Sequence, residues 1–119
     1  MAELTCTISL DKAAGVAVKI EGGSATQTIT LDGTTLTLEV KGSAGATRIV
    51  QTASDVTIKC TTFTVEATGD VSIKAGAAIK LAGVTEAELG AAMVKVEADS
   101  MATVKGNLIS AQGQLVKLG

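Results

Sequence analysis

The chain has 119 residues and a formal net charge of −2, and it contains no Pro, His, Trp or Tyr and a single aromatic residue, Phe63. Its few, scattered charges argue against a nucleic-acid partner. Without His, and with one Arg, acid–base catalysis has little to work with, so we expect no enzyme.

The interior of such a chain has to be built from many small side chains. Aromatic residues normally supply much of the buried area of a core, and here Gly, Ala, Val and Thr dominate instead. Many β-branched residues stacked in register suit a narrow, regular interior. We therefore expect an all-β fold of repetitive architecture.

The sequence shows no membrane or export signal that we recognise. No apolar run reaches 18 residues, so we expect no transmembrane helix. The stretch Met1–Thr5 lacks a basic region followed by an apolar one, so we expect no secretory signal and predict assembly in the cytoplasm. Cys6 and Cys60 lie in phase with apolar neighbours and are read as small buried hydrophobes. No metal site or cofactor is expected, because there is no His and no Cys-x-x-Cys pair.

Residues 1–50 are predicted to be a β-rich N-terminal part. Ile29 and Leu31 form one alternating stretch, and Leu36, Leu38 and Val40 form another seven residues later. Glycine-rich breaks fall at 22–24 and 42–45. This part either attaches the chain to a larger hub or forms the first layers of the body that follows.

Eight of the nine lysines share one short frame, in which an apolar residue precedes Lys and a small or apolar residue follows it. Neighbouring side chains of a strand point to opposite faces, so each copy buries its flanks and exposes its Lys. The frame recurs at Lys19, Lys41, Lys59, Lys74, Lys80, Lys95, Lys105 and Lys117.

Residues 51–119 are predicted to be a repetitive β-helical needle. Apolar triplets restart at 56, 63, 71 and 79, with breaks at 61–62, 68–70 and 76–77, and glycines 106 and 113 indicate further corners. Segment 84–92 interrupts the pattern as a helical turn or a side loop. The residues predicted to pack inward are Val56, Ile58, Phe63, Val65, Val71, Ile73, Ile79, Val94, Val96 and Val104.

An octad with three inward residues is too thin to enclose a core alone. Single-chain solenoids use longer repeats, about 20 residues or more. If three chains each supply one side of a triangular layer, the small interior suits Val, Ile, Ala and Thr. The fold class predicted is therefore an intertwined triple-stranded β-helix, a trimeric β-prism.

The octads resemble those of a known family. Segments 55–67 and 69–75 resemble the C-terminal β-helix of VgrG proteins of type VI secretion and of phage baseplate spikes. The stretches 93–98, 101–106 and 116–119 are similar to the end of such needles, and the resemblance covers about 45–119.

The resemblance implies a homotrimeric spike at the tip of an inner tube. A contracting sheath drives such a spike through a target envelope. The resemblance therefore implies hub and tube proteins as partners and transient contact with the target membrane. It also implies a final location in a virion tail or outside the cell. The usual hub or oligonucleotide-binding domain is missing, which suggests a stand-alone spike or a fragment. No His-x-His iron site is present. A separate tip protein of the PAAR kind is an implied partner, and its candidate docking face is Leu115, Val116, Lys117, Leu118 and Gly119.

Three alternatives stay open. An ice-binding or carbohydrate-binding β-solenoid would use Thr-x-Thr triplets, and those that begin at residues 5, 28, 35 and 62 are separated by irregular steps of 23, 7 and 27 residues. A polysaccharide-cleaving β-helix would need clustered carboxylates, whereas Asp55, Asp70 and Asp99 are better read as corner residues, and Glu86 and Glu88 as loop residues. A fibre shaft or adaptor would share the spike's fold.

Overall fold

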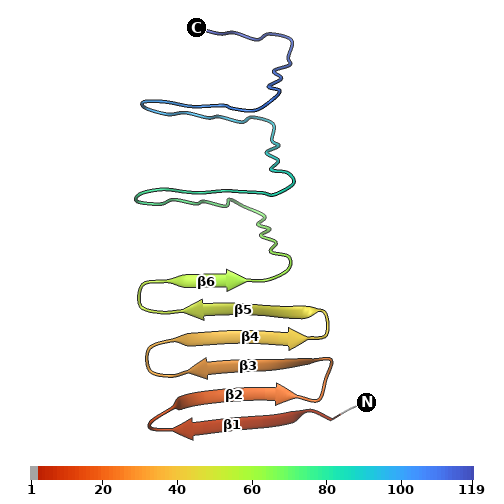
Figure 1. Ribbon diagram of the computed structural model, residues 1–119, viewed down its shortest axis with the longest axis vertical. Helices are drawn as coiled ribbons and strands as arrows, with labels where there is room; N and C mark the ends of the chain where they lie inside the picture. Colours follow the sequence, from red (N-terminus) through yellow and green to blue (C-terminus); the bar gives the residue numbers. More distant parts are fainter. Residues whose placement is uncertain (1–2) are drawn as a thin grey trace. The chain divides into compact units, whose positions relative to one another are not determined.

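The computed structural model describes residues 3–119 and contains six β-strands (Figure 1). They are β1 (Thr5–Asp11), β2 (Gly15–Glu21), β3 (Ala25–Leu31), β4 (Leu36–Gly42), β5 (Gly45–Gln51) and β6 (Val56–Lys59). Met1 and Ala2, which begin the stretch inspected for a secretory signal, lie outside the described residues. The chain forms two compact units, Met1–Val71 and Ser72–Gly119.

The first unit is an antiparallel meander. Its sheet order is β1-β2-β3-β4-β5-β6, so each strand pairs with the next one along the chain (Figure 1). The strands predicted around residues 29–31 and 36–40 are confirmed as β3 and β4. Their pairing by hairpins follows from the short breaks between strands, which suit tight turns.

Acidic and hydroxyl side chains close three of the turns. Asp11 Oδ1 accepts hydrogen bonds from the backbone N–H of Ala13 at 2.7 Å and of Ala14 at 3.3 Å. Asp32 Oδ1 accepts from the N–H of Thr34 at 2.9 Å and of Thr35 at 2.8 Å. The carboxylates accept hydrogen bonds from backbone N–H groups that have no carbonyl partner in the turn. Asp favours turn positions for this reason.

The turn between β5 and β6 uses a hydroxyl instead. Thr52 Oγ1 accepts from the N–H of Asp55 at 3.0 Å, and the N–H of Thr52 donates to the Asp55 carbonyl at 2.9 Å. The Ser54 hydroxyl donates to Asp55 Oδ2 at 3.0 Å. The prediction that Asp55 is a corner residue is therefore confirmed, although its own backbone rather than its carboxylate makes the turn.

Gly15 is required at the start of β2 for two reasons. Its φ of 98° lies in the left-handed region that glycine adopts at little cost. A Cβ atom at this position would also overlap the backbone carbonyl oxygen of Leu31. The close approach lets the first hairpin turn tightly while β2 stays paired with β3.

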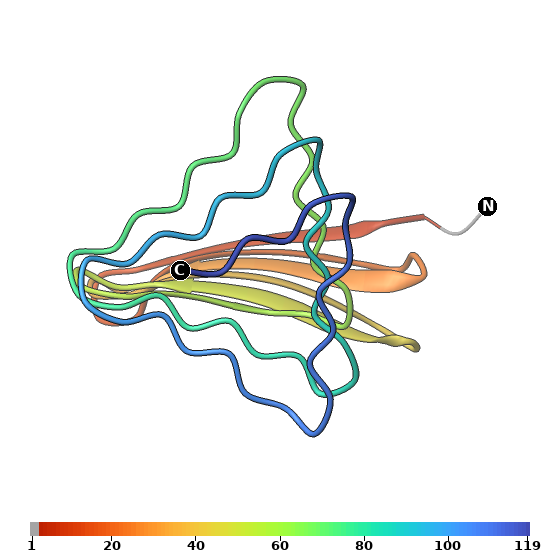
Figure 2. The ribbon, with the colours of Figure 1, turned by 90° about the horizontal axis from the view of Figure 1, so that it is seen from above.

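The second unit consists of extended runs separated by regular bends. Bends fall at residues 76–77, 84–85, 92, 99–100, 107 and 113–114, which is every six to eight residues. Figure 2 shows that these runs trace triangular turns. The bends at 76–77 and 99–100 are 23 residues apart with two bends between them, so three runs make one turn.

This path confirms the corners predicted at 76–77 and close to glycines 106 and 113. The interruption predicted for 84–92 is wrong, because bends at both ends of that segment keep the common spacing and no helix forms in it. The sequence misled because small and acidic residues there hide the alternation.

No described residue of the single chain is buried. The accessible surface of the chain is 11607 Å², whereas a compact protein of its mass exposes about 5,900 Å². The all-β prediction is confirmed. The six-stranded sheet is open, and a single copy does not form the predicted triple-stranded β-helix.

Candidate functional site

The first candidate surface is one face of the six-stranded sheet, here called the apolar face. Residues that are directly opposite each other in paired strands point to the same side of the sheet. The apolar face therefore consists of Cys6, Ile8, Leu10, Val16, Val18, Ile20, Gln27, Ile29, Leu31, Leu36, Leu38, Val40, Thr47, Ile49, Gln51, Val56 and Ile58. It contains no charged side chain.

The apolar face is organised in three rows that cross the strands. The central row is unbroken and entirely aliphatic, with one residue from each strand: Ile8, Val18, Ile29, Leu38, Ile49 and Ile58. The three polar members of the face, Gln27, Thr47 and Gln51, all lie in the two outer rows. Five of the six central-row residues are exposed in the single chain, with Ile8 at 69% and Ile29 at 42%, and Val18 is half-buried.

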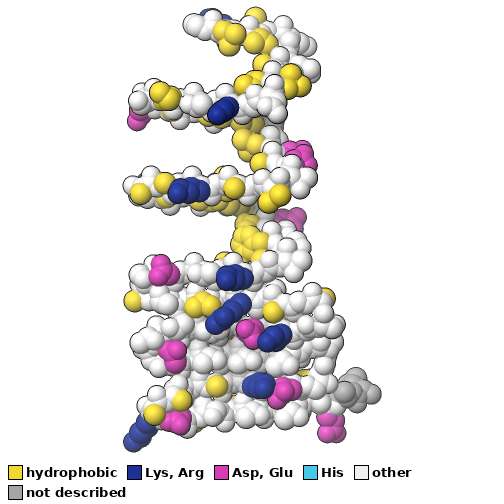
Figure 3. Space-filling view, viewed as in Figure 1, with side chains coloured by type: hydrophobic (Ala, Val, Ile, Leu, Met, Phe, Trp, Pro, Cys, Tyr) yellow, Lys and Arg dark blue, Asp and Glu magenta, His cyan; other side chains and the backbone are white. Residues whose placement is uncertain are grey.

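The opposite face, here called the charged face, has the composition of a solvated surface. Its own middle row runs Thr7, Lys19, Thr28, Glu39, Arg48 and Lys59. The Arg48 Nε lies 4.0 Å from Glu39 Oε2 across the β4–β5 pair. Figure 3 shows basic and acidic side chains interspersed over the sheet. Exposed ion pairs of this kind contribute little stability. Their presence indicates that the charged face is exposed to solvent.

The second candidate surface is the set of extended runs in the second unit. No strand and no backbone hydrogen bond is present within the described residues 72–119. The space-filling view in Figure 3 shows gaps between successive turns of this unit. Backbone N–H and C=O groups are obligatory hydrogen-bonding groups, and an extended chain normally pairs them with neighbouring strands.

The residues predicted to pack inward are divided between the two units. Val56 and Ile58 belong to β6 and to the apolar face, and Phe63, Val65 and Val71 follow β6 within the first unit. Ile73, Ile79, Val94, Val96 and Val104 lie in the second unit. All ten are exposed in the single chain. Their burial remains a prediction that requires further chains.

The predicted docking segment is the last extended run. Leu115, Val116, Lys117, Leu118 and Gly119 follow the bend at 113–114. Leu118 is 91% exposed. An apolar segment at this position is chemically suited to contact another protein, and its partner remains a prediction.

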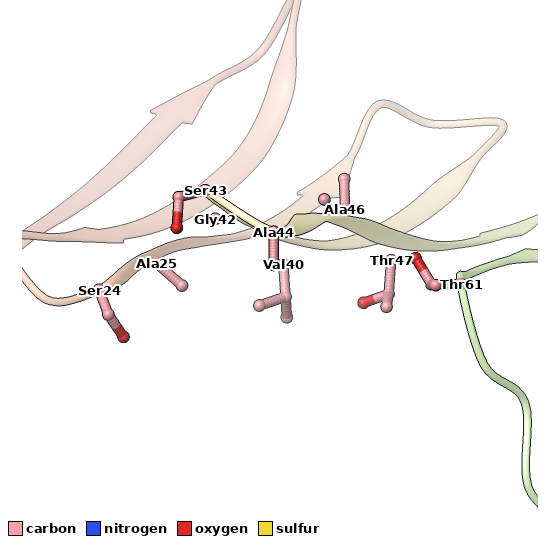
Figure 4. A pocket seen from close by; sticks show the side chains of 10 residues that line it. Ser24, Ala25, Val40, Gly42, Ser43, Ala44, Ala46, Thr47 and Thr61 are labelled. Atoms are coloured by element: carbon pink, nitrogen blue, oxygen red, sulfur yellow. The ribbon is translucent and has the colours of Figure 1, made fainter.

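The first unit has hollows on both faces of its sheet: one lined by Arg48, Val50, Thr57 and Lys59 lies on the charged face, and two others lie on the apolar face. A hollow of about 290 Å³ contains Val18, Ile29 and Leu38 in its lining. Another, of about 400 Å³, lies beside the β4–β5 turn, where Val40 and Thr47 point to the same side (Figure 4). Only Ser, Thr, Gly, Ala and Val line this second hollow, so it offers a small apolar surface and no titratable group.

The described residues contain no group of three or more His, Cys, Asp and Glu side chains placed to hold a metal ion. Both cysteines are free. No helix in the described part of the chain is both long and apolar enough to cross a bilayer.

The Thr triplets considered for ice binding do not combine into one Thr array on the sheet. Thr28 on β3 stands between Lys19 of β2 and Glu39 of β4. A regular lattice of hydroxyl and methyl groups is therefore interrupted by charges at this row.

The sequence missed two features of this site. Five of the six residues of the central row precede residue 51 and are absent from the ten residues predicted to pack inward, although the Lys19 frame did predict that Val18 is buried. The alternation that places them on one face was visible, but their alignment across strands depends on register. The turn carboxylates of Asp11 and Asp32 were also missed, although each begins a short break after an alternating stretch, which is a turn signal.

Comparison with family models, with curated proteins and with solved structures finds no match to this chain.

Proposed function

We propose that the chain is the subunit of a rigid, homotrimeric structural spike, of the kind that contractile injection systems use to puncture an envelope. The observation that carries this proposal is the second unit: triangular turns of extended chain whose backbone groups have no partner within the unit. Such turns leave room for two further copies to supply the missing strands of every layer.

The side chains of these runs support the same proposal. Val94 and Val96 alternate with Lys95, so intertwined copies would bury the valines and expose the Lys. Lys95 Nζ lies 3.1 Å from Glu97 Oε2, and both side chains are exposed. Such a prism would present charges to solvent on all three walls, which keeps its outer surface from adding strands.

The mechanism required of a spike is mechanical. Three interlocked chains cannot separate one at a time without breaking every layer, so unfolding under load would be slow. The packing residues would carry force by contact, and no reaction or cofactor is needed. The exposed run 115–119 would be the place for a tip protein of the PAAR kind.

The proposal is tested by resistance of the assembled protein to dissociation. We expect the purified chain to migrate on a gel in sodium dodecyl sulfate as a trimer without boiling, and as a monomer after boiling. Migration as a monomer under both conditions, together with a monomeric mass in buffer, would contradict it. Neighbouring genes for sheath and tube proteins would separate a spike from a fibre shaft of the same fold.

A further inference from the structure

We infer that Arg48 and Lys59, here called the basic pair, bind a phosphate group on the charged face of the sheet, together with the Thr57 hydroxyl. The three residues lie on β5 and β6 of one chain. The inference therefore goes beyond the proposed spike and does not depend on the number of copies that assemble.

The strand register places the two cations of the basic pair side by side. Arg48 lies directly opposite Lys59, and Val50 lies directly opposite Thr57 in the adjacent row. Figure 3 shows basic side chains gathered over β4 to β6. Residues directly opposite each other have Cβ atoms about 5 Å apart, so the guanidinium and ammonium groups can both reach one small anion.

The positive charge of this region is only partly balanced by the chain itself. Like charges directly opposite each other destabilise a pair of strands. Glu39 supplies one negative charge, with its Oε2 4.0 Å from Arg48 Nε. Within the described residues, neither Lys59 nor Lys41, which lies on the same face of β4, forms an ion pair. A bound anion would therefore offset the repulsion within the basic pair.

The basic pair lines a hollow that is open to solvent. Its volume is about 210 Å³, and its other lining residues are Val50 and Thr57, so no carboxylate lines it. A water molecule takes about 30 Å³ of the liquid, so the hollow has room for a small anion with some of its waters. The Arg48 side chain is 53% exposed, which leaves the guanidinium accessible to a ligand from solvent.

The donors around the hollow favour a phosphate group over a carboxylate. A phosphate monoester carries a charge of about −1.5 to −2 and three acceptor oxygens. Arg48 can donate two hydrogen bonds in parallel, Lys59 acts as a point charge, and the Thr57 hydroxyl can donate one further bond. A carboxylate, with one charge and two oxygens, would be satisfied by the guanidinium alone.

Titration calorimetry with inorganic phosphate tests the charge requirement in the full-length protein. We expect Lys59→Gln to bind phosphate at least about tenfold more weakly than the unchanged chain. Lys19→Gln is the matched control, because Lys19 lies 3.5 Å from Glu21 and is about 19 Å from Lys59 across four strand spacings. That distance exceeds the screening length of about 10 Å at 0.1 M salt, so the control should bind as the unchanged chain does.

A second pair of variants leaves the charge unchanged. We expect Thr57→Val, which removes only the hydroxyl from the hollow, to weaken phosphate binding at least about threefold. Thr37→Val is its control, since Thr37 lies in the same row on β4 and does not line the hollow. Light scattering and thermal melting establish that each variant keeps the assembly of the unchanged chain. Thr57→Val also keeps the test decisive if Lys59→Gln does not fold.

Vesicles distinguish a free phosphate ligand from a lipid headgroup. Co-flotation with phosphatidylcholine vesicles that contain phosphatidic acid, but not with phosphatidylcholine alone, and its loss in Lys59→Gln would identify the headgroup as a ligand. Calorimetric binding of inorganic phosphate without co-flotation would identify the free ion.

Three results would overturn the site and leave the proposed spike standing. One is the absence of binding to millimolar phosphate and to both kinds of vesicle. Another is equal weakening by Lys59→Gln and Lys19→Gln, which would indicate diffuse attraction to the whole charged face. The third is binding of acetate as tightly as phosphate, which would contradict the assignment of a phosphate group.

Discussion

The turn at Asp32 shows how one side chain stabilises a hairpin. Its carboxylate accepts hydrogen bonds from the backbone of Thr34 and Thr35 and from the Thr34 hydroxyl, which lies 3.0 Å away. These bonds lower the pKa of Asp32 below its ordinary value of 3.8, and the bond from the Thr34 N–H has the largest effect. Charged acceptors make the stronger bonds, so the ionised form is the one that holds the turn.

A pH-dependent stability difference follows from this turn. Because the folded state has the lower pKa, the stabilising contribution is present above pH 3.8 and is lost as the pH falls through the folded pKa. We expect D32N, which keeps an acceptor oxygen but no charge, to be less stable than the unchanged chain at pH 7. The difference should shrink below pH 3.8. Thermal melting at pH 7 and pH 3 measures it, and a gap that widens in acid would contradict the argument.

Gly15 provides a second prediction at the scale of a residue. We expect Gly15→Ala to destabilise the first unit by at least about 1–2 kcal/mol, the usual cost of left-handed backbone for an L-residue, with the overlap against the Leu31 carbonyl added to it. Gly69→Ala is the control, since a Cβ there meets nothing within 4 Å and its φ is not in the left-handed region. Denaturant unfolding compares the two variants. Equal midpoints would show that the close approach at Gly15 is unimportant.

At the scale of the elements, the two sheet faces have different consequences for assembly. Ile49 lies in the central row, and its chain neighbour Val50 points to the charged face. We expect Ile49→Lys to abolish or strongly weaken the proposed trimer if further copies cover the apolar face, because an unpaired buried charge costs several kcal/mol. Val50→Lys should leave the mass unchanged.

Light scattering across a range of concentrations measures this difference. If both lysine variants remain trimeric with equal melting temperatures, the central row does not lie in an interface. If both variants dissociate, a lysine is tolerated on neither face of the sheet. That result would contradict the distinction between a buried apolar face and a solvated charged face.

The sequence predicted the strands and corners but not how they pair. Alternation and breaks are local signals, so the strands near Ile29 and Leu38 and the corners at 68–69 and 76–77 could be read directly. Whether alternating stretches fold back as hairpins or wind as a solenoid depends on contacts between strands. Residues 5–59 form hairpins, and the later bends follow the predicted octad.

The core residues were harder to predict for the same reason. Val56 and Ile58 were predicted to pack inward, and they lie on the apolar face of β6. Ile49, the cross-strand partner of Ile58, was not predicted to pack inward, because only the register of β5 and β6 reveals that it continues the same row. The irregular Gly-rich breaks at 22–24 and 42–45 likewise concealed the register between β2 and β3 and between β4 and β5.

At the scale of the whole molecule, neither unit buries its apolar side chains within the single chain. Each described residue is at least partly accessible to solvent in the single chain, and marginal stability cannot be reached without apolar burial. We therefore expect assembly to supply the core, and we expect folding and association to occur together. A chain of this kind is expected to unfold in a single concentration-dependent transition.

Molar mass in solution tests the central claim most directly. Light scattering with refractive-index detection suits a chain without Trp or Tyr, which absorbs almost no light at 280 nm. We predict one sharp species near three times the 11.8 kDa mass of the chain, unchanged on dilution. A well-folded species at the mass of a single chain would contradict the account.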